Sequence, residues 1–191
     1  MQATSYRMGL GDPAPSFKDL PGVDGKRYSL ESFKTKAALV VFWHCNHCPY
    51  SQAFEDRLNQ AAQDYAPRGF GFVAINSNDA AEYPEDSFEN MVARAKAKGL
   101  VFPYLFDESQ RVAEAYGAVC TPHVFVFDAS RRLVYQGRVD GFKDDAAKGQ
   151  AMDLRNALDD LLRGRTVRTP VTLAFGCSIK WGRDHFARIK V

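Results

Sequence analysis

Cys45 and Cys48 are the residues whose type and spacing point most directly to chemistry. Two residues separate them, and the pair follows an apolar run at 38–43 and precedes a segment with helical periodicity. Two thiols spaced in this way, on a turn from a strand into a helix, can form a disulfide without movement of the backbone, and the helix N-terminus favours the thiolate over the thiol. The motif therefore predicts a redox-active dithiol.

A second motif separates this interpretation from half of a zinc site, which has the same Cys-x-x-Cys spacing. Thr121-Pro122 directly precedes an apolar and β-branched run at 123–128. Proline cannot donate to a β-ladder, so it fits the start of a strand, and its peptide bond is the one that adopts the cis form at low cost. A dithiol turn followed by such a proline resembles the thioredoxin fold, in which the cis-proline loop faces the disulfide.

Hydrophobic patterns predict the elements that position these motifs. The run at 38–43 is apolar throughout, as expected for a central strand covered on both faces. Further strands are predicted at 70–76, 103–106, 123–128 and 132–138, a hairpin at 23–30, and helices over 54–65, 88–95, 108–116 and 154–162. This order predicts an α/β protein with the thioredoxin fold, three layers (α/β/α) around a central mixed sheet, with an added N-terminal β-hairpin, an inserted helix and a C-terminal tail.

The length of 191 residues predicts one thioredoxin-like domain, residues 1–191, with a core at about 11–164 and a tail at 165–191. The tail contains Phe175, Cys177 and Trp181. Because aromatic residues are rare in disordered segments, we expect the tail to pack on the core.

Charge and composition exclude several classes of function. The net charge is +2, from 25 basic and 23 acidic side chains that are scattered along the chain, so no nucleic-acid binding is predicted. The longest apolar run is too short to span a bilayer and the N-terminus lacks the apolar segment of a signal peptide, so we expect a cytoplasmic protein without membrane contact. Four cysteines are too few for a disulfide scaffold and suggest catalytic or metal-binding thiols.

Three strings carry a family resemblance: Cys-Asn-His-Cys-Pro-Tyr at 45–50, Cys-Thr-Pro at 120–122 and Gly-Cys-Ser-Ile-Lys-Trp at 176–181. Over about residues 11–181 the chain resembles bacterial thioredoxin-like proteins that are grouped with the peroxiredoxins of the alkyl hydroperoxide reductase and thiol-specific antioxidant (AhpC/TSA, redoxin) family. The resemblance implies thiol–disulfide chemistry, with antioxidant activity and a role in cell redox homeostasis.

The chain departs from both neighbouring patterns. Peroxiredoxins place a threonine three positions before the peroxide-reacting cysteine, and relative to Cys48 that position is Cys45, so the hydroxyl that positions a peroxide is absent. Thioredoxins place a buried aspartate six residues before the first cysteine, where this chain has Leu39. We therefore expect His44 or His47 to accept the proton during thiol–disulfide exchange.

We expect Cys45 to be the attacking thiol, as the exposed cysteine of the turn, and Cys48 to resolve the mixed disulfide. His47 lies between the thiols and could stabilise a thiolate when protonated. The alternative is that His44 and His47 are solvated loop imidazoles.

Pro122 is expected to be cis and to keep the site open for a substrate chain, whose backbone would pair with Thr121. Cys120 and Cys177 have two interpretations. Either they are buried small hydrophobic residues, or one of them lies close enough to the dithiol to act as an auxiliary resolving thiol.

The leading hypothesis is a thiol–disulfide oxidoreductase that cycles between a Cys45–Cys48 disulfide and the dithiol. Its partners would be protein or small-molecule thiols and disulfides, with no cofactor and no resident metal, and the sequence makes no prediction of oligomeric state. The second hypothesis is a peroxiredoxin-like peroxidase that uses Cys48, with Cys45 or Cys120 resolving. The third is a zinc-binding or interaction module with ligands drawn from the four cysteines and the histidines.

Overall fold

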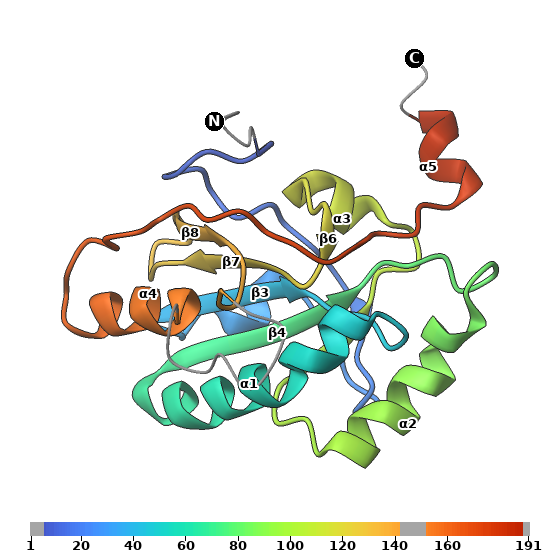
Figure 1. Cartoon of the computed structure of the whole chain (residues 1–191), viewed down its shortest axis with the longest axis horizontal. Helices are drawn as coiled ribbons and strands as arrows, with labels where there is room; N and C mark the ends of the chain where they lie inside the picture. Colours follow the sequence, from blue (N-terminus) through green and yellow to red (C-terminus); the bar gives the residue numbers. More distant parts are fainter. Residues whose placement is uncertain (1–5, 142–151, 189–191) are drawn as a thin grey trace.

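The computed structural model describes residues 6–141 and 152–188, which form a central sheet with helices on both faces (Figure 1). The helices and strands, in chain order, are β1 (Leu20–Pro21), β2 (Arg27–Tyr28), η1 (Leu30–Phe33), β3 (Ala38–Trp43), α1 (Pro49–Tyr65), η2 (Ala66–Arg68), β4 (Phe70–Asn76), η3 (Pro84–Asp86), α2 (Phe88–Lys98), β5 (Tyr104–Phe106), α3 (Arg111–Tyr116), β6 (Cys120–Thr121), β7 (His123–Phe127), β8 (Leu133–Gly137), α4 (Asp153–Leu162), β9 (Cys177–Ser178) and α5 (Arg183–Arg188).

The main sheet is mixed, with strand order β5-β4-β3-β7-β8. β3 pairs parallel with β4 and antiparallel with β7, and the outer pairs are β4 with β5 (parallel) and β7 with β8 (antiparallel). The chain passes from β3 through α1 to β4, which is the predicted βαβ unit. The predicted mixed-sheet α/β fold is confirmed.

β3 is apolar throughout because its two faces belong to two different cores. Val40 and Phe42 pack in a cluster with residues of α1, α2 and α4, whereas Val41 and Trp43 pack in a second cluster with α3 and the N-terminal segment. Burying each large apolar side chain contributes roughly 1.5–3 kcal/mol, so β3 is firmly held. Its carboxyl end, from which the dithiol turn departs, is therefore a rigid platform.

Some predicted boundaries are wrong by a few residues. The helix predicted over 108–116 begins only at Arg111, because the Asp107 carboxylate accepts the amides of Val112 and Ala113 at 3.1 and 3.0 Å and thereby caps the helix. Gln110 precedes it with a φ of 62°, which no helix interior adopts. The N-terminal hairpin lies slightly earlier than predicted, with strands at 20–21 and 27–28.

The described part of the tail follows the sheet edge and then crosses to the dithiol. Gln136 of β8 exchanges backbone hydrogen bonds with Pro170 and Thr172, each of 3.0 Å. Further on, β9 pairs antiparallel with β6, with Thr121 opposite Cys177. The last described element of the tail is α5, a helix that the sequence did not predict (Figure 1).

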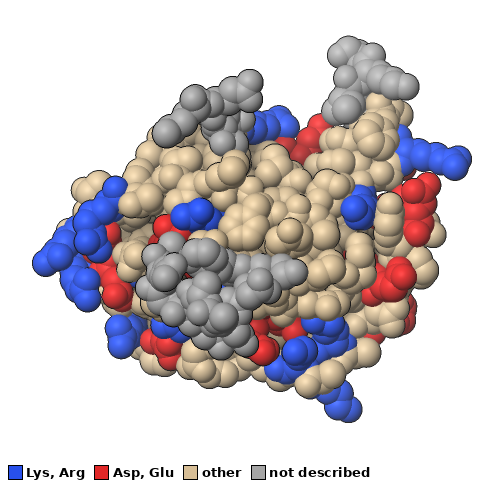
Figure 2. All heavy atoms as spheres, in the orientation of Figure 1, with Lys and Arg blue, Asp and Glu red and all other residues tan. Residues whose placement is uncertain are grey.

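On the face shown in Figure 2, the described acidic and basic side chains are interspersed around the rim, while uncharged residues fill most of the centre. This distribution agrees with the scattered charges of the sequence. Among the described residues, no helix is both long and apolar enough to cross a membrane.

Candidate active site

The dithiol lies on the turn between β3 and α1. β3 ends at Trp43, and Cys48 is the residue directly before Pro49, which begins α1. Proline is favoured as the first residue of a helix because the amide that it lacks would have no partner there. The Ser51 amide in the first turn donates to the Cys48 sulfur. The unpaired N–H groups of the helix start therefore favour a negative charge on Cys48.

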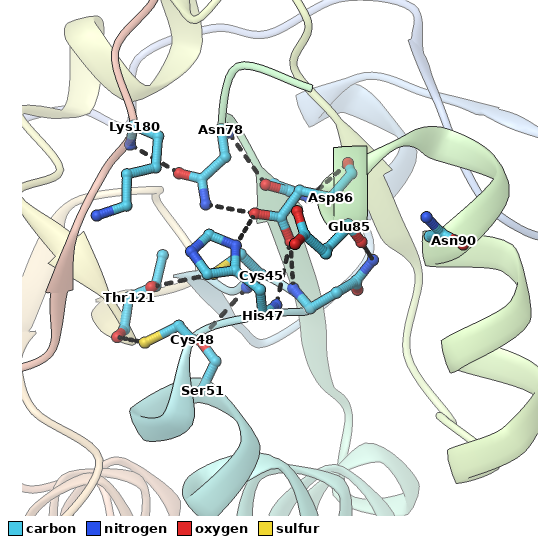
Figure 3. A network of polar contacts seen from close by, with 12 residues as sticks. Cys45, His47, Cys48, Ser51, Asn78, Glu85, Asp86, Asn90, Thr121 and Lys180 are labelled. Atoms are coloured by element: carbon cyan, nitrogen blue, oxygen red, sulfur yellow. Dashed lines mark hydrogen bonds and ion pairs between the residues drawn. The ribbon is translucent and has the colours of Figure 1, made fainter. Parts of the chain in front are cut away.

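Both sulfurs are buried. Cys45 is 1% exposed and Cys48 is 0% exposed. The Cys45 Sγ lies 3.3 Å from the Thr121 Oγ1, and the Cys48 Sγ lies 3.2 Å from the Thr121 carbonyl oxygen, to which it donates when it is protonated (Figure 3). The expectation that Cys45 is exposed is therefore wrong, because Thr121 and the strand paired with it cover the turn.

One sulfur of the pair takes the negative charge and the other keeps its proton. The pKa of Cys48 falls to about 4, mainly because the Cys45 thiol donates a hydrogen bond to it. Burial opposes this fall, and a second hydrogen bond, from the Cys177 thiol, adds to it. The hydrogen bond to Cys48, then burial and the charge of Asp86, raise the pKa of Cys45 above its ordinary value. The thiolate therefore forms on Cys48, which contradicts the expected enrichment of the Cys45 thiolate.

Asp86 on η3 is a buried carboxylate that the sequence did not identify. Its Oδ1 accepts the amides of Asn46 at 2.6 Å and His47 at 3.3 Å, and its Oδ2 accepts the Asn78 Nδ2 at 2.7 Å (Figure 3). The same Oδ2 lies 2.6 Å from the His47 Nδ1. The string Tyr-Pro-Glu-Asp-Ser at 83–87 reads as an ordinary polar turn, so no local signal distinguishes Asp86 from an exposed carboxylate.

Asp86 holds the His47 ring beside the dithiol. A ring nitrogen of His47, an oxygen of Asp86 and the Cys45 Sγ all lie within 4.8 Å of one another. The ring also stacks on Tyr83, with centroids 5.5 Å apart and planes at 10°. The His47 side chain is 24% exposed, so it reaches solvent where the thiols do not. An imidazole in this position can carry a proton between Cys45 and water.

His44 belongs to a different network. It is fully buried, and its Nε2 lies 3.1 Å from the Glu55 Oε2, which is also bound by the Arg94 Nε at 2.7 Å. Although burial raises the pKa of Glu55, the hydrogen bonds from His44 and Arg94 lower it to about 2. The interpretation of His44 as a solvated imidazole is wrong. His44 ties the segment after β3 to Glu55 of α1, which in turn binds Arg94 of α2.

The cis-proline loop faces the dithiol as expected. The Thr121–Pro122 peptide bond is cis. Thr121, which we expected to pair with a substrate chain, pairs with Cys177 of the protein's own tail. Cys120 is buried, which raises its pKa to about 12, and its thiol points to the Pro122 carbonyl oxygen at 3.6 Å. Of the two auxiliary thiols, Cys177 is therefore the one that contacts the dithiol.

Within the described residues, Cys45, His47 and Asp86 also form a group that could approach a metal ion. Both oxygens of Asp86 are already used by N–H donors of Asn46, His47 and Asn78. A zinc ion would have to replace these hydrogen bonds and would need a fourth ligand. The geometry fits a charge-relay contact between carboxylate and imidazole better than a metal site.

A thioredoxin fold whose Cys-x-x-Cys turn faces a cis-proline defines the protein as a thiol–disulfide oxidoreductase. The chain belongs to the redoxin family, whose profile matches residues 10–152. Both results confirm the class predicted from the sequence.

The chain is also similar in sequence or structure to individual proteins. The thiol-disulfide oxidoreductase ResA of Bacillus anthracis is 26% identical over 136 residues, which are 70% of this chain and 72% of that protein. An uncharacterized conserved protein from Geobacillus kaustophilus has a similar solved structure, with 45% identity, a TM-score of 0.87 and coverage of 96% of this chain and 98% of that chain. A hypothetical protein from Sinorhizobium meliloti gives 43% identity, a TM-score of 0.85 and coverage of 92% and 96%, respectively.

Proposed function

We propose that Cys45 and Cys48 exchange disulfides with protein or small-molecule thiols, and that the attacking sulfur is Cys48. The observation that carries the proposal is the convergence of both sulfurs on Thr121, with the thiolate favoured on Cys48. This assignment exchanges the two roles expected from the sequence, because the order of attack follows the thiolate and not the order along the chain.

The reaction has two steps. The Cys48 thiolate attacks one sulfur of a substrate disulfide, the substrate S–S bond breaks, and one substrate sulfur leaves as a thiolate. Cys45 then gives its proton to His47 and attacks the Cys48 sulfur of the mixed disulfide. The Cys45–Cys48 disulfide forms, the second substrate sulfur leaves, and the substrate has gained two electrons. Asp86 acts as a positioning residue for His47.

The test is exchange with glutathione disulfide, followed by peptide mapping without reductant. We expect a Cys45–Cys48 disulfide in the wild-type protein, no exchange in Cys48→Ser and loss of turnover in Cys45→Ser/Cys177→Ser, which lacks both thiols that contact Cys48. Cys120→Ser is the matched control and should exchange normally, because its thiol hydrogen-bonds to the Pro122 carbonyl and burial keeps it protonated. Full activity of Cys48→Ser, or a wild-type protein that forms no Cys45–Cys48 disulfide, would overturn the proposal.

Peroxide reduction is a second candidate, favoured by the lowered pKa of Cys48 and its several hydrogen-bond donors. A peroxide would oxidise the Cys48 thiolate to a sulfenic acid, and Cys45 would condense with it to form the disulfide and water. Peroxide reduction would account for the predicted antioxidant role. The cytoplasmic location is a separate point and stays a prediction. Peroxide consumption no faster than that of free cysteine would eliminate it.

A further inference from the structure

The segment 175–182 of the tail is fixed directly over the dithiol. At one end, Phe175 packs edge-on against Tyr50 and Phe54 of α1, with ring centroids 5.9 and 5.8 Å apart. At the other end, the Lys180 amide donates to the Asn78 Oδ1 at 2.9 Å, and its carbonyl oxygen accepts the Asp79 amide at 2.9 Å. Cys177 lies between these two attachments.

Between the two ends, the tail lies against the same carbonyl group that contacts Cys48. A Cβ atom at Gly176 would lie 2.1 Å from the Thr121 carbonyl oxygen, so only glycine permits this approach. That oxygen is 3.2 Å from the Cys48 Sγ. Thr121 is also the residue paired with Cys177. Three independent contacts therefore place the tail strand and Cys48 on one peptide group.

The Cys177 thiol meets Cys48 at the start of α1. Its sulfur hydrogen-bonds to Cys48 and accepts the amide of Tyr50 in the first turn of α1. The Cys48 sulfur accepts the next amide, that of Ser51. Burial and the neighbouring Cys48 raise the pKa of Cys177 to about 11 while Cys48 is charged. A disulfide on Cys48 removes that negative charge, and the helix N-terminus that the two sulfurs share then favours a thiolate on Cys177.

We propose that Cys177 is a third redox-active cysteine, which resolves disulfides on Cys48 and forms a Cys48–Cys177 disulfide. The proposal rests on the proposed function, since it needs a disulfide on Cys48. The Cys177 thiolate attacks the Cys48 sulfur of a mixed disulfide, the bond from Cys48 to the substrate sulfur breaks, and that sulfur leaves as a thiolate. The same attack on the Cys45–Cys48 disulfide would release Cys45. In both cases β9 acts as an internal substrate strand, held in the place where Thr121 was expected to bind a foreign chain.

The test uses glutathione disulfide with the Cys45→Ser variant, in which Cys45 cannot resolve. The Cys48 thiolate takes one glutathione, and Cys177 should then displace it. We expect mass spectrometry to find a Cys48–Cys177 disulfide and two released glutathione thiols. Cys45→Ser/Cys120→Ser should behave identically, whereas Cys45→Ser/Cys177→Ser should keep a stable glutathione adduct on Cys48. Cys45→Ala repeats the measurement if serine disturbs the packing.

The outcomes separate the two proposals. A glutathione adduct that persists on Cys48 in the single variant, or a Cys48–Cys120 disulfide, would overturn the role of Cys177 while the proposed function stands. No adduct on Cys48 in the Cys45→Ser/Cys177→Ser protein would overturn the proposed function itself, and the role of Cys177 with it.

Discussion

Replacing Gly176 with alanine should open the dithiol to reagents in solution. The new Cβ would lie 2.1 Å from the Thr121 carbonyl oxygen and 2.7 Å from its carbon, both of them backbone atoms. Thr121 is held in place, because the adjoining β7 belongs to the central sheet and the Cys48 Sγ contacts the same carbonyl oxygen at 3.2 Å. The tail must therefore shift. Overpacking of this kind costs about 1–3 kcal/mol, which raises the open fraction of the tail roughly 5- to 150-fold.

The assay is the rate at which iodoacetamide alkylates Cys45 and Cys48 in the reduced protein at neutral pH. Because both sulfurs are buried in the closed form, alkylation requires local opening, and its rate should rise by the same factor as the open fraction. Gly182→Ala is the control, since a Cβ there would meet the Asp79 Oδ2 at 2.9 Å, the end of a side chain that can rotate away. An unchanged rate in a folded Gly176→Ala protein, or an equal increase in the control, would refute the reasoning.

Three further predictions concern stability, each measured by urea denaturation in the presence of reductant. The unfolding free energy should rise from about pH 4 to about pH 8.5, because the lowered pKa of Cys48 leaves a thiolate in the native state where the unfolded chain keeps its proton; Cys48→Ala should abolish the rise. Asp86→Asn should cost about 3 kcal/mol, because buried N–H donors lose a charged acceptor. Glu55→Gln should cost about 2–3 kcal/mol by leaving His44 and Arg94 against a neutral amide.

Matched measurements separate these effects. Cys120→Ala should retain the pH dependence of the wild-type protein, and its loss there would contradict the assignment of the titration to Cys48. Asp86→Asn should also slow disulfide closure by Cys45, since it releases His47, whereas Glu55→Gln should change stability but not the exchange rate. An Asp86→Asn protein that is as stable as wild type and closes its disulfide at the same rate would contradict the role given to Asp86.

The sheet could be predicted because its strands carry their own signals. β3 and β4 are apolar on both faces and β7 begins directly after a proline, so composition and position agree at each. The start of α3 could not be read in the same way. The helical periodicity of 108–116 gives no sign of a break at Gln110. Only the tertiary structure shows that the Asp107 carboxylate caps a helix that begins at Arg111. The two-residue strand β9 carries no strand signal of its own and exists through its partner β6.

Site residues that belong to a local motif could be predicted from the sequence. Contacts between segments that are distant in the sequence could not. The Cys-x-x-Cys turn and Thr121-Pro122 lie together as their strings suggested. The burial of Cys45 could not be foreseen, because it depends on a tail that returns to β6 from the far end of the chain. Asp86 was missed for the same reason: a carboxylate becomes unusual only when a fold surrounds it with the donors Asn46, His47 and Asn78.

The position of the carboxylate changes how this site handles protons. Leu39, where the resemblance to thioredoxins would place a buried aspartate, is fully buried in the apolar cluster behind β3, and a carboxylate there would meet a costly apolar environment. Asp86 instead approaches the dithiol from η3 with its negative charge satisfied by N–H donors, and it acts through a histidine that is 24% exposed. A proton that leaves Cys45 therefore reaches solvent through His47 without crossing the apolar core.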